Sequence, residues 1–191
     1  MFLKYGIKSV TMDDIARELG ISKKTLYQFV KDKNDLVNKA MDFQISVDKQ
    51  KMADIKSKRL DAVSELLEIA DFVSQTLKSI GTSAIFDIQK YYPEVWRSHF
   101  EYRRSFVSEG IADNIAKGIK EGNYRKNMNA DVIAKFFVVK LENLFDDRVF
   151  PPDQYNLAEV YLEYIRYHLM GIASPKGAEY IIEKICKKPL K

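Results

Sequence analysis

Apolar residues recur every three or four positions over long stretches of this chain, and the breaks between stretches fall at Gly and Pro. This spacing is that of amphipathic α-helices. No segment shows the period of two that marks a strand, so the predicted fold class is all-α. The predicted helices cover about residues 11–19, 22–30, 31–56, 60–79, 83–91, 93–121, 130–148, 155–171 and 178–185.

Capping signals mark the first two of these helices. Thr11 followed by Asp14 resembles a capping box, in which the threonine oxygen accepts a hydrogen bond from a free amide of the first turn. Gly20 ends this helix because glycine adopts positive φ without strain, and Ser22 caps the next helix. The sequence therefore predicts two short helices joined by a tight turn.

The residues of these two helices divide into a predicted core and a predicted surface. The core candidates are Ile15, Leu19, Ile21, Leu26 and Phe29, with the small Ala16 where the helices cross. The second helix exposes hydrogen-bond donors and basic groups, namely Lys23, Lys24, Thr25, Tyr27 and Gln28. Such side chains suit phosphates and base edges in a major groove. This pattern predicts a DNA-binding helix-turn-helix.

The segment from Thr11 to Leu36 resembles the DNA-binding signature of the TetR (tetracycline-repressor) family. The shared features are the initial threonine, Asp-Ile-Ala, the Gly turn, Ser22, Thr-Leu-Tyr followed by Phe29, and then Lys33 and Leu36. The resemblance implies that Thr11, Tyr27 and Lys33 bind phosphates. It places Ser22, Lys23, Lys24, Thr25 and Gln28 at or near the groove.

Family members have a full first helix, and here Phe2-Leu3-Lys4-Tyr5-Gly6 resembles only its last turn. We expect that the sequence starts inside this helix; the alternative is that the protein lacks the rest of it.

Charge is unevenly distributed along the chain. Residues 1–40 hold eight basic side chains against five acidic ones, so they carry most of the net charge of +4. A basic end on a nearly neutral body suggests a polyanionic partner. We predict a helix-turn-helix domain at 1–40 and a larger helical domain for effector binding and dimerisation at 41–191.

Other chemistry is poorly supported. His99 and His168 lack zinc-ligand spacing, and Asp146-Asp147 beside Arg148 reads as a solvated helix end rather than a metal pair. Cys186 is the only cysteine, and we interpret it as an ordinary small apolar residue. No nucleophile–base pattern or phosphate loop is present. We therefore expect no metal, no cofactor and no enzymatic activity. The lack of a membrane-spanning run or signal peptide favours a cytoplasmic protein.

Two further sites are predicted in the helical domain. An apolar effector pocket is assigned to Phe72, Phe86, Tyr92, Trp96, Phe100 and Phe106. A dimer interface is assigned to the two late helices through Phe137, Leu141, Leu144, Tyr161, Ile165 and His168. The competing interpretation of these apolar stripes is that they face the chain's own core.

The resemblance implies a homodimeric transcriptional repressor that binds a palindromic operator in double-stranded DNA. A small apolar or amphipathic effector would release it by preferring one spacing of the two DNA-reading heads. The alternatives are a helical adaptor that has lost DNA binding and, less favoured by the residues, a helical enzyme.

Overall fold

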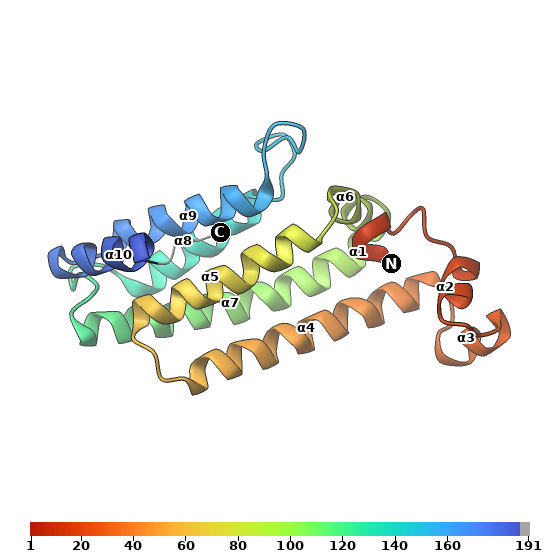
Figure 1. Cartoon of the computed structure of the whole chain (residues 1–191), viewed down its shortest axis with the longest axis horizontal. Helices are drawn as coiled ribbons and strands as arrows, with labels where there is room; N and C mark the ends of the chain where they lie inside the picture. Colours follow the sequence, from red (N-terminus) through yellow and green to blue (C-terminus); the bar gives the residue numbers. More distant parts are fainter. Residues whose placement is uncertain (188–191) are drawn as a thin grey trace. The chain divides into compact units, whose positions relative to one another are not determined.

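The computed structural model describes residues 1–187, which form helices joined by short loops (Figure 1). This confirms the predicted all-α class. The helices are α1 (Phe2–Tyr5), α2 (Met12–Glu18), α3 (Lys23–Phe29), α4 (Lys33–Ser57), α5 (Ala62–Ser79), α6 (Thr82–Tyr91), α7 (Pro93–Glu121), α8 (Ala130–Asn143), α9 (Leu157–Ile172) and α10 (Pro175–Lys187). Most predicted boundaries lie within a few residues of these.

The helices belong to two compact units. The first unit consists of Met1–Lys51 with Ser79–Tyr102, and the second of Met52–Lys78 with Arg103–Lys191. The sequence predicted a boundary at residue 40, and it assigned residues 79–102 to the larger domain. In the structure these residues, which include α6, cluster instead with the N-terminal helices. The N-terminal helices therefore pack with an element that is distant in sequence.

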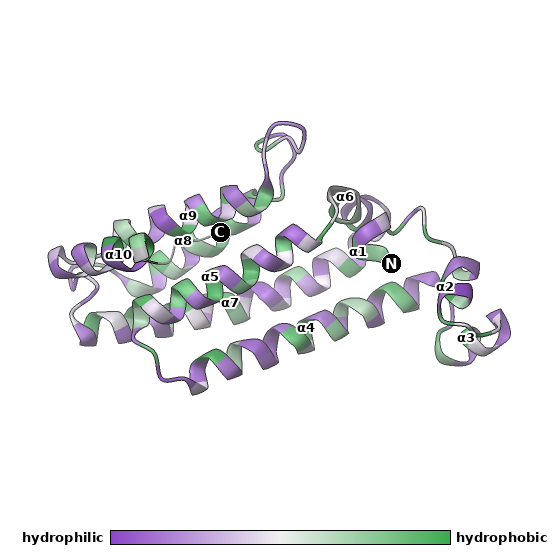
Figure 2. Cartoon of the chain, viewed as in Figure 1, coloured by the Kyte–Doolittle hydropathy of each residue, from purple (hydrophilic) through white to green (hydrophobic). Residues whose placement is uncertain are grey.

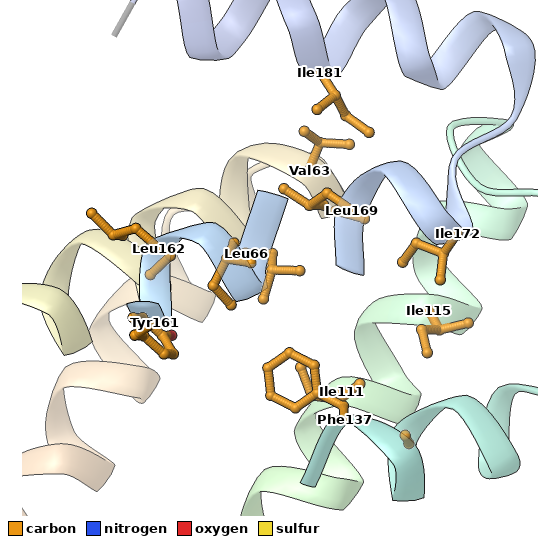
Figure 3. Close-up of a cluster of buried hydrophobic side chains, with 14 of the residues drawn as sticks. Val63, Leu66, Ile111, Ile115, Phe137, Tyr161, Leu162, Leu169, Ile172 and Ile181 are labelled. Carbon is orange, nitrogen blue, oxygen red and sulfur yellow. The ribbon is translucent and has the colours of Figure 1, made fainter. Parts of the chain in front are cut away.

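The second unit is built around one large hydrophobic core, to which α5, α7, α8, α9 and α10 contribute (Figure 3). Along α9 the buried positions follow one face at helical spacing, as the periodicity predicted. Residues at the centre of this core are Val63, Leu66, Ile111, Ile115, Phe137, Tyr161, Leu162, Leu169, Ile172 and Ile181. Burial of each large aliphatic or aromatic side chain contributes about 1.5–3 kcal/mol.

The first unit has two smaller apolar clusters. One joins α2 and α3, and the other joins Ile7, Val37, Ile88 and Val95 from four separate segments. Phe2 packs against both clusters. The N-terminal segment therefore connects the core of the helix-turn-helix with residues of α4, α6 and α7.

Hydrophilic and hydrophobic residues are interspersed along the long helices, as Figure 2 shows. Within residues 1–187 no helix is long and apolar enough to cross a membrane.

The end of α7 packs closely against the loop that follows it. A Cβ atom on Gly118 would lie only 2.1 Å from Cδ2 of Tyr124, whose side chain is buried. The Tyr124 hydroxyl donates to Oδ1 of Asn114 at 3.1 Å, which holds the ring in this position. By contrast, a Cβ on Gly110 of the same helix would meet open space.

These two glycines provide a matched test of the packing. Gly118→Ala is expected to lower the free energy of unfolding by about 1–3 kcal/mol, because the methyl group overlaps a fixed, buried ring. Gly110→Ala is expected to raise it by about 0.5–1 kcal/mol, because it only replaces a flexible helical residue. Denaturant titration of both variants measures the difference. Equal unfolding free energies would contradict the packing described for Tyr124.

Candidate DNA-binding site

Helix α2 begins with the capping box that the sequence predicted. The Asp14 amide donates to Oγ1 of Thr11 at 3.1 Å, and the Thr11 amide donates back to Oδ2 of Asp14 at 3.0 Å. The Thr11 hydroxyl also donates to this carboxylate at 2.6 Å. The hydrogen bonds from Thr11 lower the pKa of Asp14, and the nearby Arg17 lowers it further. Two amides of the first turn are thus satisfied locally.

The turn between α2 and α3 also follows the prediction. Gly20 has a φ of +65°, in the region that favours glycine, so the helical conformation of α2 ends there. Ser22 is the N-cap of α3 and accepts a hydrogen bond from the Thr25 amide at 3.0 Å. The two hydroxyl oxygens of Ser22 and Thr25 lie 2.8 Å apart. These contacts fix the start of α3 relative to the turn.

The core between α2 and α3 differs in part from the prediction. Ile15 and Leu26 are buried and Ile21 is partly buried, whereas Leu19 and Phe29 are 60% and 69% exposed. The prediction was wrong for these two residues because both lie at helix ends, where the periodic face no longer continues. Met12 and Ala16 of α2 also belong to this core. Two residues outside the helices complete it: Val10, which precedes α2, and Val30, which follows α3 in extended conformation.

The surface of α3 exposes four polar side chains, and one of them is engaged in an ion pair. Lys24, Tyr27 and Gln28 are exposed, and Lys24 and Gln28 lie one helical turn apart. Lys23 is also exposed, but its ammonium lies 2.9 Å from Oδ1 of Asp13, and this partner raises its pKa. Thr25 is partly buried beside Ser22. Lys24, Tyr27 and Gln28 are consequently the members of the predicted set best placed to meet a ligand.

Lys33, a predicted phosphate contact, is oriented by the protein itself. Its ammonium donates to the carbonyl oxygen of Lys8 at 3.3 Å, at the N-terminal end of α4. Burial lowers the pKa of Lys33, and the charge of Asp87 partly opposes this effect. A phosphate contact by Lys33 remains a prediction.

The predicted effector-pocket residues are distributed over both units. Trp96 and Phe100 are stacked with ring centroids 5.1 Å apart, and Tyr92 and Trp96 pack against the Ile7 cluster. The first unit also contains Phe86, which is exposed beneath Lys90, while the second unit contains Phe72 and Phe106. A surface pocket of about 490 Å³ beside α1 and α2 is lined by other residues.

The residues predicted for a dimer interface point into the chain's own core. Phe137, Leu144, Tyr161, Ile165 and His168 are buried within the second unit, and Leu141 is partly buried. The alternative interpretation of these stripes is therefore correct for the buried five. The periodicity identified the helices but not the outward face, where the exposed apolar side chains are Val132, Phe136 and Val139 of α8 and Tyr167 and Met170 of α9.

No metal site is found in the described part of the chain, where no group of three potential ligands comes together. The Asp146 carboxylate instead accepts hydrogen bonds from Arg148 at 2.9 and 2.7 Å, which lower its pKa to about 2. Asp146 is thus a charged partner of Arg148 in the turn after α8, which ends at Asn143 and not at the predicted residue 148. Cys186 is a free cysteine and is exposed.

A capped helix, a glycine turn and a second short helix with an exposed polar face define a helix-turn-helix protein of the DNA-binding class. Residues 1–40 match the family model described as "Bacterial regulatory proteins, tetR family". The chain is a TetR-family helix-turn-helix transcriptional regulator, and it belongs to a family of regulators rather than enzymes.

Similarity to known proteins extends over nearly the whole chain. The HTH-type transcriptional regulator YvaF of Bacillus subtilis is 23% identical over 174 residues, which cover 90% of each chain. The structure of a transcriptional regulator from Cytophaga hutchinsonii superposes with a TM-score of 0.71 at 23% identity, covering 91% of this chain and 93% of that one. The ketosteroid transcriptional regulator KstR2 of Mycobacterium tuberculosis gives 0.61 at 19% identity, covering 91% and 90%.

His168 is a buried titratable group in the second unit. Its ring meets the Phe137 ring edge-on at 4.8 Å, and its Nε2 atom has no hydrogen-bond partner in the structure. Burial, together with a smaller contribution from the positive charge of Lys140, lowers the pKa of His168 from 6.5 to about 4. The folded protein therefore holds this imidazole neutral at pH values where the unfolded chain protonates it.

This difference predicts a loss of stability in acid. Above pH 6.5 the imidazole is neutral in both the folded and the unfolded chain, so it gives no pH dependence. As the pH falls from 6.5 toward 4 the unfolded chain is protonated first, and the free energy of unfolding decreases by about 2–3 kcal/mol. Unfolding free energies of the wild type and His168→Leu, compared from pH 7 to pH 4, isolate this contribution from the carboxylates. The wild type should lose stability relative to the variant by that amount. A difference that stays constant with pH would show that His168 is not held neutral.

Proposed function

We propose that this protein is a homodimeric repressor that binds a palindromic operator and leaves it when a small effector binds. The observation that carries the proposal is the free polar face of α3, with Lys24, Tyr27 and Gln28 exposed on a helix whose start is fixed by Ser22. Amides, hydroxyls and ammonium groups on such a helix match the donors and acceptors of the major groove. A helical adaptor has no need for this arrangement.

A second copy of the chain is the proposed partner of the outer face, defined as Val132, Phe136, Val139, Tyr167 and Met170. Phe136 and Tyr167 are 58% and 66% exposed, an unusual degree for such large rings. The Lys140 ammonium lies 4.6 Å from the centre of the Tyr167 ring, so the α8 and α9 stripes adjoin. Both helices would pair with their symmetry mates.

The palindromic operator in this proposal follows from the twofold symmetry of the dimer. Two copies related by a twofold axis carry two α3 helices, and these read half-sites about 34–36 Å apart in successive major grooves. A rigid interface is required because a variable spacing would lose one of the two contacts.

The proposed effector is a small apolar or amphipathic molecule. Support comes from the aromatic content of residues 86–106, including the stacked Trp96 and Phe100. The similar fold of KstR2, a regulator named for ketosteroids, favours the same ligand chemistry. Release would follow if the effector binds more tightly to a form of the dimer that does not fit the operator.

Operator binding is tested on DNA selected from a random pool. Tyr27→Phe removes only the hydroxyl, and we expect about threefold to tenfold weaker binding to all selected sequences alike, as for a lost phosphate contact. Gln28→Ala should change the preferred base at one position of each half-site. Binding titrations and repeated selection measure the two effects.

If the Lys24 ammonium contacts a phosphate, Lys24→Ala should weaken binding and reduce the slope of the salt dependence by about one. Lys126→Ala is the control, since this exposed lysine lies outside the first unit. The assignment of α3 fails if all three α3 variants bind as the wild type does.

The dimer is tested by placing a charge on the outer face. Phe136→Glu combined with Tyr167→Glu should shift sedimentation from twice the chain mass to the monomer mass of 22.2 kDa, because two buried charges per copy would oppose association. Phe43→Glu is the matched control, since Phe43 is a 69% exposed phenylalanine on α4. If the double variant stays dimeric with an unchanged helical spectrum, the interface lies elsewhere.

A further inference from the structure

A buried acid on α6 holds the loop that leads into the helix-turn-helix. Asp87 is 7% exposed, and its Oδ2 atom accepts a hydrogen bond at 2.7 Å from the amide of Lys8, which is 79 residues away in sequence. A buried carboxylate is costly unless it is hydrogen-bonded or paired with a positive charge. The Lys8 amide satisfies part of this requirement, and the loop is fixed in return.

This loop, and helix α1 before it, are attached at several other points. The carbonyl oxygen of Lys8 accepts from the Lys33 ammonium at 3.3 Å, so both main-chain polar groups of Lys8 are engaged. The Lys8 ammonium donates to the hydroxyl of Tyr91 at 3.1 Å, one turn beyond Asp87 on α6. The Gly81 amide, just before α6, donates to the Leu3 carbonyl at 2.8 Å.

Apolar packing reinforces this attachment. Ile7 and Ile88, the neighbours of Lys8 and Asp87, are both buried in the cluster that also contains Val37 of α4. Three residues after Lys8 the chain reaches Thr11, the N-cap of α2. A displacement of the Lys8 loop would therefore move the start of α2 and remove the acceptor that orients Lys33.

We propose that Asp87 is a positioning residue for DNA binding: by holding the Lys8 amide it fixes the entry to α2 and the Lys33 ammonium at the DNA-reading end. This role rests on the operator binding proposed above. Asp87 itself contacts no DNA in this arrangement, because its carboxylate is buried and would repel phosphate. Asp87 acts through Lys8, whose amide it binds, and through Lys33, whose ammonium donates to the carbonyl oxygen of Lys8.

The test compares Asp87→Ala with Asp87→Asn. The alanine has no acceptor for the Lys8 amide, whereas the asparagine amide oxygen retains one in nearly the same shape. We expect Asp87→Ala to bind selected operator DNA about tenfold more weakly, because the buried Lys8 amide loses its acceptor and neither the entry to α2 nor the Lys33 ammonium is then held in place. Asp87→Asn should bind within about threefold of the wild type. Glu94→Ala, which removes an exposed acid of the same unit, should have no effect.

Hydrogen exchange of the Lys8 amide provides a second readout. The wild type and Asp87→Asn should protect it, and Asp87→Ala should exchange it at least tenfold faster while the α3 and α9 amides keep their protection. The inference is overturned if Asp87→Ala binds DNA like the wild type, or if Lys8 exchange is unchanged. A wild type that binds no selected DNA overturns the proposed function and the role of Asp87 in it, and Lys8 exchange then reports separately whether Asp87 anchors the loop.

Discussion

Helix α3 is only seven residues long, and a helix of this length is not stable alone in water, where about 12–15 residues are needed. Its existence therefore depends on contacts outside its own backbone. Ser22 satisfies a free amide at its start, and Leu26 and Val30 bury its inner side against α2. Because the inner side is held in this way, the outer side can carry solvent-exposed polar residues such as Lys24, Tyr27 and Gln28. A DNA-reading surface requires this separation between what holds the helix and what it presents.

The support of α3 extends into a part of the chain that is remote in sequence. Phe2 packs against both the α2–α3 core and the cluster that includes Ile88 of α6. Asp87 adds a directional hydrogen bond to the same connection. Apolar packing alone would tolerate small shifts of the loop, whereas a buried carboxylate leaves its partner little freedom. The helix-turn-helix is consequently part of a larger unit, in which α6 contacts the segment that leads into α2.

Helices α8 and α9 also have one face that packs in the core and another that is exposed. Phe137 and Phe136 are neighbours in sequence, yet one is buried in the core and the other is exposed. The inner faces are sufficient to hold these helices in the second unit. The outer apolar side chains are largely exposed in one chain, and association of two chains is the physical explanation that we propose for them. His168 lies on the inner side, where burial makes its protonation unfavourable.

The local features of this protein were determined by the sequence itself. The capping box of Thr11, the turn at Gly20 and the cap at Ser22 depend on side-chain and backbone atoms at most three residues apart, so they can be read from the order of residues. The positions of the long helices follow from periodicity for the same reason. The family resemblance lay within this local segment.

Only the tertiary structure decided which apolar residues are inside and which polar groups meet. Leu19 and Phe29 have the spacing of core residues but are exposed, whereas Val10 and Val30, which lie outside the helices, belong to the core. The pairing of Asp87 with Lys8 left no signal in either local sequence. Burial and long-range hydrogen bonds depend on segments brought together by folding, and a helical period specifies only that a face is apolar, not which partner covers it.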